Sequence, residues 1–144
     1  MKRESDGDEA ASQLICGGCH CGEIRYQAVS PVYQLTHCHC SICRAFGGTL
    51  MSWIAVDQSG FEITRGQTRI YKSSQKAQRE FCETCGTHLT FKRLANSKRM
   101  DIALTTLDQP ADFAPDNQIW GMDRLALLAD INDLPISPED GDKS

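Results

Sequence analysis

The sequence predicts a mainly β domain with little helix, and three observations lead to this fold class. Apolar residues often recur at every second position, as in Ile24, Tyr26 and Ala28, which is the period of a strand with one buried face. Helical periodicity is confined to short stretches. Seven of the eight cysteines fall in tight groups, a pattern typical of metal-crosslinked domains. We therefore expect short antiparallel sheets stabilised by bound metal.

The expected elements follow in chain order. Alternation predicts strands around residues 24–28, 50–56, 89–91 and 102–104. The alternating segments Phe61–Arg65 and Thr68–Lys72 flank Gly66-Gln67, which predicts a hairpin whose glycine adopts positive φ. Helix is expected only as one turn at residues 41–46 and two turns at 123–131.

A chain of 144 residues lies in the usual range for one domain, and we place that domain at residues 13–136. The flanking segments, 1–12 and 137–144, are rich in charge, serine and glycine and contain almost no large apolar residues. Such composition cannot offset the entropy lost on ordering, so both are predicted to be disordered tails.

Composition excludes several classes of protein. The net charge of −4 provides no basic surface for nucleic acid or anionic membranes. No apolar run approaches the roughly 18 residues that a membrane span requires. The polar start of the chain does not resemble a secretory signal peptide, which predicts a cytoplasmic protein and disfavours disulfides.

The cysteines are therefore interpreted as metal ligands. They form the groups Cys19-x-Cys21, Cys38-x-Cys40-x-x-Cys43 and Cys82-x-x-Cys85. Zinc prefers four such ligands, and short spacing lets one turn of backbone supply two of them. Gly22 and Gly86 directly follow the outer pairs, where positive φ allows backbone amides to approach the sulfurs.

Spacing also suggests how the ligands are divided. Cys38, Cys40 and Cys43 lie within six residues and are expected to share one ion. The two remaining pairs, Cys19/Cys21 and Cys82/Cys85, would then enclose another. Four thiolates suit a structural zinc, whereas three leave a position for water or substrate, as catalytic zinc requires. The three-ligand ion is expected to be the more labile. The opposite pairing, or a fourth ligand from Cys16, His37 or His39, stays compatible with the sequence.

Longer motifs resemble the glutathione-dependent formaldehyde-activating enzyme family, whose fold the centromere protein V group shares. They are Gly17-Gly18-Cys19-His20-Cys21-Gly22-Glu23-Ile24-Arg25-Tyr26, Cys38-His39-Cys40-Ser41-Ile42-Cys43-Arg44 and Arg79-Glu80-Phe81-Cys82-Glu83-Thr84-Cys85-Gly86-Thr87. The resemblance implies a β-rich Mss4-like fold with a structural zinc on Cys19, Cys21, Cys82 and Cys85. It also implies a catalytic zinc on Cys38, Cys40 and Cys43.

The family's reaction joins formaldehyde to the glutathione thiol, so the resemblance implies a carbon-sulfur lyase that forms or cleaves S-hydroxymethylglutathione or a related adduct. The alternative is a non-catalytic, zinc-stabilised Mss4-like binding module. The chain departs from the family pattern at His88, where proline often follows Cys-Gly-Thr, and at Gln118, where histidine often precedes Ile-Trp. Both departures predict a changed substrate pocket. The sequence fixes neither the thiol and aldehyde nor the oligomeric state.

Other residues receive simpler interpretations. His20 and His39 alternate with cysteines, so they are expected to point away from the metal. Arg44 is expected to be a solvated surface charge and Cys16 a half-buried free thiol. Trp53 and Trp120 are predicted to be core or interface residues.

Overall fold

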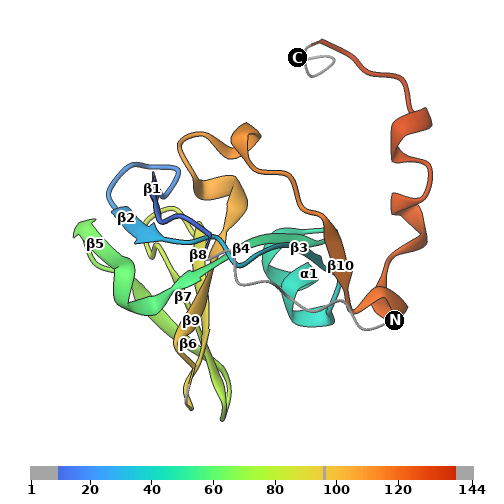
Figure 1. Ribbon diagram of the computed structural model, residues 1–144. Coiled ribbons are helices and arrows are strands. Elements are labelled where there is room, and N and C mark those ends of the chain that lie inside the picture. The colour runs from blue at the N-terminus through green and yellow to red at the C-terminus, as the bar shows by residue number, and fades with distance from the viewer. Residues whose placement is uncertain (1–9, 96, 139–144) are drawn as a thin grey trace, which may run out of the picture.

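Two β-sheets make up the body of the protein in the computed structural model, which describes residues 10–95 and 97–138 (Figure 1). Most of the two predicted tails, residues 1–9 and 139–144, lies outside the described residues. The first sheet has the strand order β1-β2-β5 and the second the order β10-β3-β4-β9-β8-β7-β6. The mainly β class predicted from the alternating pattern is confirmed.

The strands of the first sheet are β1 Gln13–Gly18, β2 Arg25–Ser30 and β5 Phe61–Arg65. Those of the second are β3 Gln34–Cys38, β4 Met51–Asp57, β6 Arg69–Ser74, β7 Ala77–Phe81, β8 His88–Arg93, β9 Arg99–Ala103 and β10 Asn117–Ile119. Within the described residues, neighbouring strands are antiparallel except for β10, which runs parallel to β3 and pairs Gln118 with His37.

The main core combines side chains from both sheets. Ile24, Ile54, Leu89 and Ile102 are almost fully buried there, and each contributes roughly 1.5–3 kcal/mol by leaving water. Tyr26 brings a polar group into this core, and its hydroxyl lies 2.7 Å from the hydroxyl of Thr106. Because that hydrogen bond satisfies the phenol, the ring can be buried without an unpaired donor.

The central position of β4 explains why its alternation is incomplete. This strand pairs with β3 on one side and β9 on the other, and residues Trp53 to Val56 are all buried. Both of its faces are covered, so no polar face remains. Trp53 belongs to a smaller second cluster with Cys38, Cys43 and Met51, which places the three-cysteine segment against the sheet.

The predicted hairpin of residues 61–72 is wrong. β5 pairs with β2 in the first sheet, whereas β6 pairs with β7 in the second, so the two segments do not hydrogen-bond as a hairpin. Gly66 does have the expected positive φ, of 77°. Its turn carries the chain from one sheet to the other because long-range pairing, which local turn signals do not encode, decides each strand's partner.

Helix is scarce, as predicted, but only one of the two expected segments forms an α-helix. α1 spans Ser41–Gly47 and begins directly after the second cysteine of the three-cysteine group. Residues 121–133 instead form three separate 3₁₀ turns. Leu127 and Ile131 stay exposed there, so no buried apolar face supports a continuous helix.

Among the residues described, none lies in a helix long and apolar enough to cross a bilayer.

The turn at Gly66 provides a test of the fold. A Cβ at this position would lie 2.4 Å from the backbone oxygen of Glu23, and positive φ adds strain to any other residue. We expect Gly66→Ala to lower the free energy of unfolding by about 2 kcal/mol in urea denaturation. Gly121→Ala, where a Cβ meets nothing within 4 Å, is the control and should change stability by less than about 0.5 kcal/mol. Equal effects of the two substitutions would contradict the geometry of this turn.

Candidate metal centres

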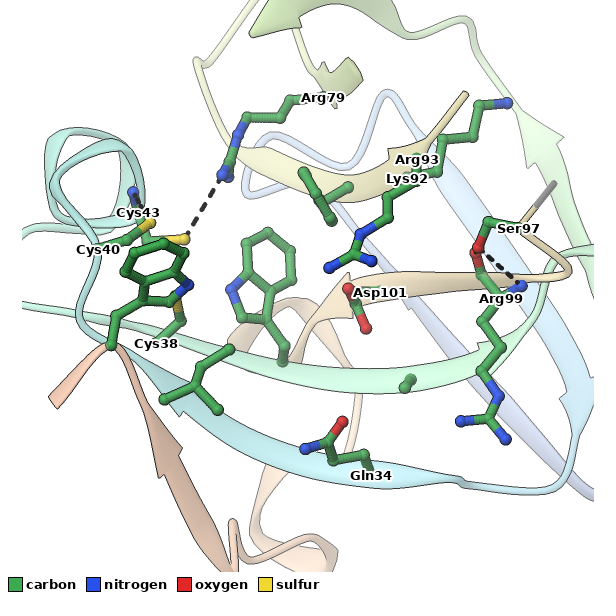
Figure 2. A pocket seen from close by; sticks show the side chains of 15 residues that line it. Gln34, Cys38, Cys40, Cys43, Arg79, Lys92, Arg93, Ser97, Arg99 and Asp101 are labelled. Atoms are coloured by element: carbon green, nitrogen blue, oxygen red, sulfur yellow. Dashed lines mark hydrogen bonds between the residues drawn. The ribbon is translucent and has the colours of Figure 1, made fainter. Parts of the chain in front are cut away.

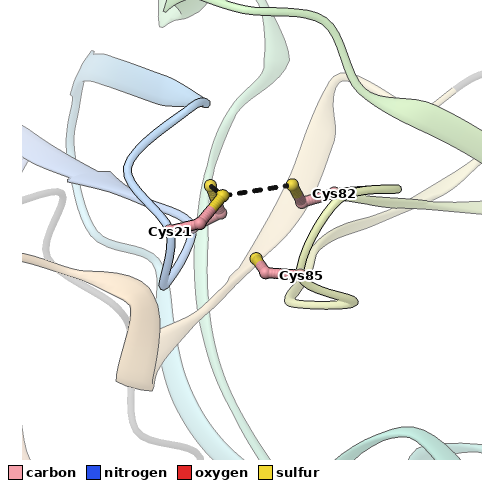
Figure 3. Close-up of side chains that lie close together, drawn as sticks. Cys21, Cys82 and Cys85 are labelled. Carbon is pink, nitrogen blue, oxygen red and sulfur yellow. Dashed lines mark hydrogen bonds between the residues drawn. The ribbon is translucent and has the colours of Figure 1, made fainter.

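Four cysteines from two distant loops form the first cluster, here called the four-cysteine cluster. Cys19 and Cys21 follow β1, while Cys82 and Cys85 lie in the loop between β7 and β8. All four sulfurs lie within 4.8 Å of one another. Figure 3 shows Cys21 on one loop facing Cys82 and Cys85 on the other. The cluster therefore joins the end of the first sheet to the second sheet.

The sulfur spacing fits a four-coordinate metal ion. A tetrahedral zinc site with bonds of about 2.3 Å places its sulfurs roughly 3.8 Å apart. The sulfurs of Cys19 and Cys21 are 3.5 Å apart, and those of Cys21 and Cys82 are 3.9 Å apart. The cluster could thus hold a metal ion with little rearrangement.

The two loops that supply these ligands have the same local form. Gly22 and Gly86 both have a φ of 78°. The amide of Gly22 donates to the carbonyl of Cys19 at 3.1 Å, and the amide of Gly86 donates to that of Cys82 at 2.8 Å. The positive φ predicted for both glycines is therefore present, and each turn brings its second cysteine back toward the first.

Neighbouring donors favour the ionised form that a metal ligand requires. The amide of Ile24 donates to Cys19 Sγ at 3.2 Å. The Thr87 hydroxyl, 3.2 Å from Cys85 Sγ, lowers the pKa of that thiol from its ordinary value of 9.0 to about 5, helped by nearby backbone amides. Donors of this kind stabilise thiolate before any cation is bound.

The second cluster, here called the three-cysteine cluster, lies where β3 passes into α1. Cys38 ends the strand, Cys40 caps the helix and Cys43 lies in its first turn, with all three sulfurs within 4.8 Å of one another. The amide of Cys43 donates to Cys40 Sγ at 3.4 Å, so the thiol takes the place of an N-cap hydroxyl. One tight connection thereby gathers three sulfurs on one side.

Electrostatics indicate that this cluster suits a cation. Burial opposes ionisation of Cys40, but the Cys43 amide and the neighbouring thiols outweigh it and lower its pKa. Burial raises the pKa of Cys38 to about 12. Thiols this close cannot all be ionised without a compensating positive charge, because each thiolate disfavours the next. A divalent ion would remove that conflict.

The fourth ligands left open by the sequence point elsewhere. His37 Nδ1 lies 2.8 Å from Ser52 Oγ, and His39 Nε2 donates to Gln118 Oε1 at 2.8 Å. Cys16 is a half-buried free thiol on β1, outside both clusters. In the described parts of the chain, no fourth cysteine, histidine or carboxylate joins the three-cysteine cluster within 4.8 Å. The structure therefore brings together the same two groups that spacing suggested.

The three-cysteine cluster opens into a cleft of about 370 Å³. Figure 2 shows Cys38, Cys40 and Cys43 at one end of the side chains that line it. The four-cysteine cluster does not line this cleft. The cleft runs along β4, β8 and β9, away from the sulfurs. Besides the three cysteines, its lining residues are Gln34, Trp53, Ala55, Arg79, Phe91, Lys92, Arg93, Ser97, Arg99, Asp101, Ile119 and Trp120. A small molecule in the cleft could therefore reach the sulfurs.

Four cations and one carboxyl group give the cleft its charge. The cations are Arg79, Lys92, Arg93 and Arg99, and the carboxyl belongs to Asp101. Burial raises the pKa of Asp101 to about 6, although the nearby arginines act in the opposite direction. The cleft is thus suited to an anionic molecule that also offers one proton or positive group.

The charged residues that line this cleft could not be recognised from the sequence. Arg79 begins the motif of residues 79–87, but its place at the cleft depends on residues that are distant in the sequence. Arg44, expected to be a solvated surface charge, donates to the carbonyl of Asp123 at 2.8 Å and does not line the cleft. Trp53 is buried as predicted and also lines the cleft, whereas Trp120 is 64% exposed at the rim rather than in the core.

The two departures noted in the sequence have distinct structural places. His88 packs against the rings of Phe46 and Trp53, with centroids 4.6 and 5.3 Å away, and does not line the cleft. Burial lowers the pKa of His88 to about 4, so it is neutral near pH 7. Gln118 anchors buried His39, and the amide of His39 also donates to the carbonyl of Ile119 at 3.1 Å. His39 thus points away from the sulfurs, and together these contacts hold β10 beside the cysteine-bearing connection.

The described residues thus form a small β-rich, cysteine-rich domain with two candidate metal centres, and the three-cysteine one opens into a cleft. Comparison with known proteins is consistent with this class. The profile of the family described as glutathione-dependent formaldehyde-activating enzyme matches residues 14–123, and the chain belongs to this family.

Individual relatives match over shorter stretches. One relative is a Halomonas elongata protein named as a putative glutathione-dependent formaldehyde-activating enzyme. It is 34% identical over 85 residues, which cover 53% of this chain and 54% of that protein's length. An uncharacterized lyase of Schizosaccharomyces pombe is 32% identical over 75 residues, covering 52% and 55%. The chain thus spans about half the length of these relatives. A crystal structure of a Rhodobacter sphaeroides protein has the same fold, with a TM-score of 0.61 at 24% identity over 72% of this chain and 98% of the other.

The two clusters should differ in their effect on stability. We expect Cys85→Ser to remove one metal equivalent and to destabilise the protein by about 3 kcal/mol or more, because its cluster joins the two sheets. Cys40→Ser should remove the other equivalent at a smaller cost, since that cluster lies within one connection. Elemental analysis and urea denaturation measure both effects. Cys16→Ser is the control and should keep both equivalents; similar destabilisation by Cys85→Ser and Cys40→Ser would contradict this difference.

Asp101 should make stability depend on pH. Its folded pKa of about 6 exceeds its ordinary value of 3.8, so the folded protein binds more protons than the unfolded chain between these values. Stability associated with this carboxyl is therefore lost as pH rises from about 4 to 6. Asp101→Asn should raise the free energy of unfolding, measured by urea denaturation, by on the order of 1 kcal/mol at pH 8 and have little effect at pH 4. Equal effects of Asp101→Asn at pH 8 and pH 4 would disprove the assignment.

Proposed function

We propose that this protein is a zinc-dependent carbon-sulfur lyase that forms or cleaves S-hydroxymethylglutathione. The observation that carries the proposal is the three-cysteine cluster at the end of a cationic cleft. Membership of the glutathione-dependent formaldehyde-activating family supports the same reaction. The proposal includes adducts of related thiols and aldehydes. These differ from S-hydroxymethylglutathione in the groups that the cleft must hold.

We assign zinc to both clusters because thiolates are ligands that it prefers. Cys19, Cys21, Cys82 and Cys85 would hold a structural ion, and Cys38, Cys40 and Cys43 would hold a catalytic one. Zinc bound to the three-cysteine cluster supplies a Lewis acid that lowers the pKa of an incoming thiol.

The charges of the cleft suit glutathione, which carries two carboxylates and one ammonium group. Lys92, Arg93 and Arg99 line the part of the cleft away from the sulfurs, so they can pair with carboxylates while the thiol faces the cysteines (Figure 2). Holding the thiol there beside an aldehyde turns a bimolecular encounter into a local one.

Asp101 is the group in the cleft that can carry the proton. In the addition, the thiol loses its proton, a bond forms between sulfur and the aldehyde carbon, and the carbonyl oxygen gains a proton. Asp101 Oδ can take the first proton and return it to oxygen, because a pKa of about 6 leaves the carboxylate ionised yet basic enough near neutral pH. In the cleaving direction the same group works in reverse.

The alternative function is a binding module whose two metal ions serve only folding. It would require a further ligand to close the three-cysteine cluster. No described residue of a suitable type fills that position, and the cleft reaches the sulfurs. These observations favour the enzyme.

Exchange spectroscopy by NMR tests the proposed reaction. With glutathione and formaldehyde, the zinc-loaded protein should accelerate exchange between free and S-hydroxymethylated glutathione by about 10-fold or more over buffer. Cys40→Ser should abolish the acceleration, and Cys16→Ser, outside both clusters, should retain it. Absence of acceleration by protein with two zinc equivalents would reject the lyase in favour of the binding module.

A further inference from the structure

Arg79 has hydrogen-bonding capacity that the protein itself does not use. This residue of β7 is only 3% exposed, and its guanidinium lies at the cleft beside the three-cysteine cluster. Its Nη2 donates to Cys43 Sγ at 3.5 Å (Figure 2). Its Nε and Nη1 are buried and have no hydrogen-bond partner in the described part of the chain. Buried donors on a charged group rarely stay unpaired, so these two are available to a water molecule or a bound ligand.

Three aromatic rings surround the charged group of Arg79. The guanidinium carbon lies 5.3 Å from the ring centroid of Phe46, 5.7 Å from that of Trp53 and 4.9 Å from that of Phe91. Ring faces attract a cation, which explains why the guanidinium can be buried. The rings also restrict its position, so its N–H groups are held in place before a ligand arrives.

Neighbouring anions do not account for the free donors either. Asp101 lines the same cleft, yet no hydrogen bond or ion pair joins its carboxylate to Arg79 in the described contacts. If Arg79 served only to balance the charge of the cysteines, the single contact to Cys43 would be sufficient. Balancing the charge of the three-cysteine cluster does not require the two further donors, Nε and Nη1.

We propose that Arg79 forms an oxyanion-binding subsite beside the three-cysteine cluster. Its ligand is the alkoxide oxygen that develops when a thiolate adds to an aldehyde, and this inference rests on the proposed function. In that step a bond forms between sulfur and carbon, and the π electron pair of the carbonyl moves onto oxygen. The unpaired Nη1 of Arg79 donates to that oxygen until Asp101 returns the thiol proton to it. Adduct cleavage uses the same contacts to stabilise the alkoxide before the carbon-sulfur bond breaks.

The subsite can be tested without turnover, by calorimetric binding of two stable glutathione derivatives. S-carboxymethylglutathione places an anionic oxygen close to the position of the alkoxide, whereas S-methylglutathione carries none. The zinc-loaded protein should bind the carboxymethyl derivative about 10-fold more tightly. Arg79→Met, which retains length but not charge, should reduce this preference to about 1-fold. Arg79→Lys, which retains charge but not the fork of donors, should reduce it by at least about 3-fold.

Lys92→Met is the matched control, because it removes a cation from the far part of the same cleft. It should weaken both derivatives equally and leave their ratio unchanged. Equal preference in the parent and in Arg79→Met would overturn the subsite. If Arg79→Met fails to fold or loses zinc, Arg79→Lys decides, and an unchanged ratio in that variant overturns the proposal.

The exchange measurement separates this inference from the proposed function. An Arg79-dependent preference in a protein that does not accelerate exchange would support the subsite and reject the lyase. Acceleration of exchange together with an Arg79-independent preference would support the lyase and reject the subsite. Within an active enzyme, Arg79→Lys should lower the rate of exchange by about 10-fold or more while the affinity for glutathione stays within about 2-fold of the parent.

Discussion

The close approach of ionisable sulfurs is the constraint on which the structure depends. In each of the two cysteine clusters, all sulfurs lie within 4.8 Å of one another. If these thiols were all ionised without a cation, they would repel one another. A divalent ion would convert that repulsion into attraction. At the four-cysteine cluster it would connect loops that lie more than sixty residues apart, since Cys21 and Cys82 are separated by 61 positions. At the three-cysteine cluster, the same chemistry stays within one strand-to-helix connection and faces a cleft.

The sequence predicted those features that depend on local spacing. Cysteines two or three positions apart must share a neighbourhood whatever the tertiary fold, and glycines after Cys21 and Cys85 indicated their turns correctly. Strand alternation similarly indicated the mainly β class. The division of seven cysteines between two groups followed from the same spacing. The three middle cysteines are close enough to share one site, which leaves the two distant pairs to form the other.

Features that depend on long-range pairing could not be predicted. β5 and β6 alternate correctly on either side of Gly66, but each finds its partner in a different sheet. The residues around position 127 carry a helical period, yet no apolar surface lies against them. Arg79 is the clearest case in the site. Its importance arises from Cys43, Phe46 and Trp53, which lie more than twenty positions away in sequence and meet it only after the second sheet has formed.

The parallel strand β10 gives the C-terminal third a defined relation to the cleft. Gln118 pairs with His37 and accepts a hydrogen bond from buried His39, so the backbone is fixed up to Ile119. Trp120 then follows at the rim with a left-handed backbone conformation, a φ of 56°. The four-cysteine cluster shares no residue with this rim. Changes in length or composition after position 119 can therefore alter which ligands fit the cleft without destabilising the fold. In such a domain, ligand specificity can diverge at the cleft rim while the four-cysteine cluster preserves the fold.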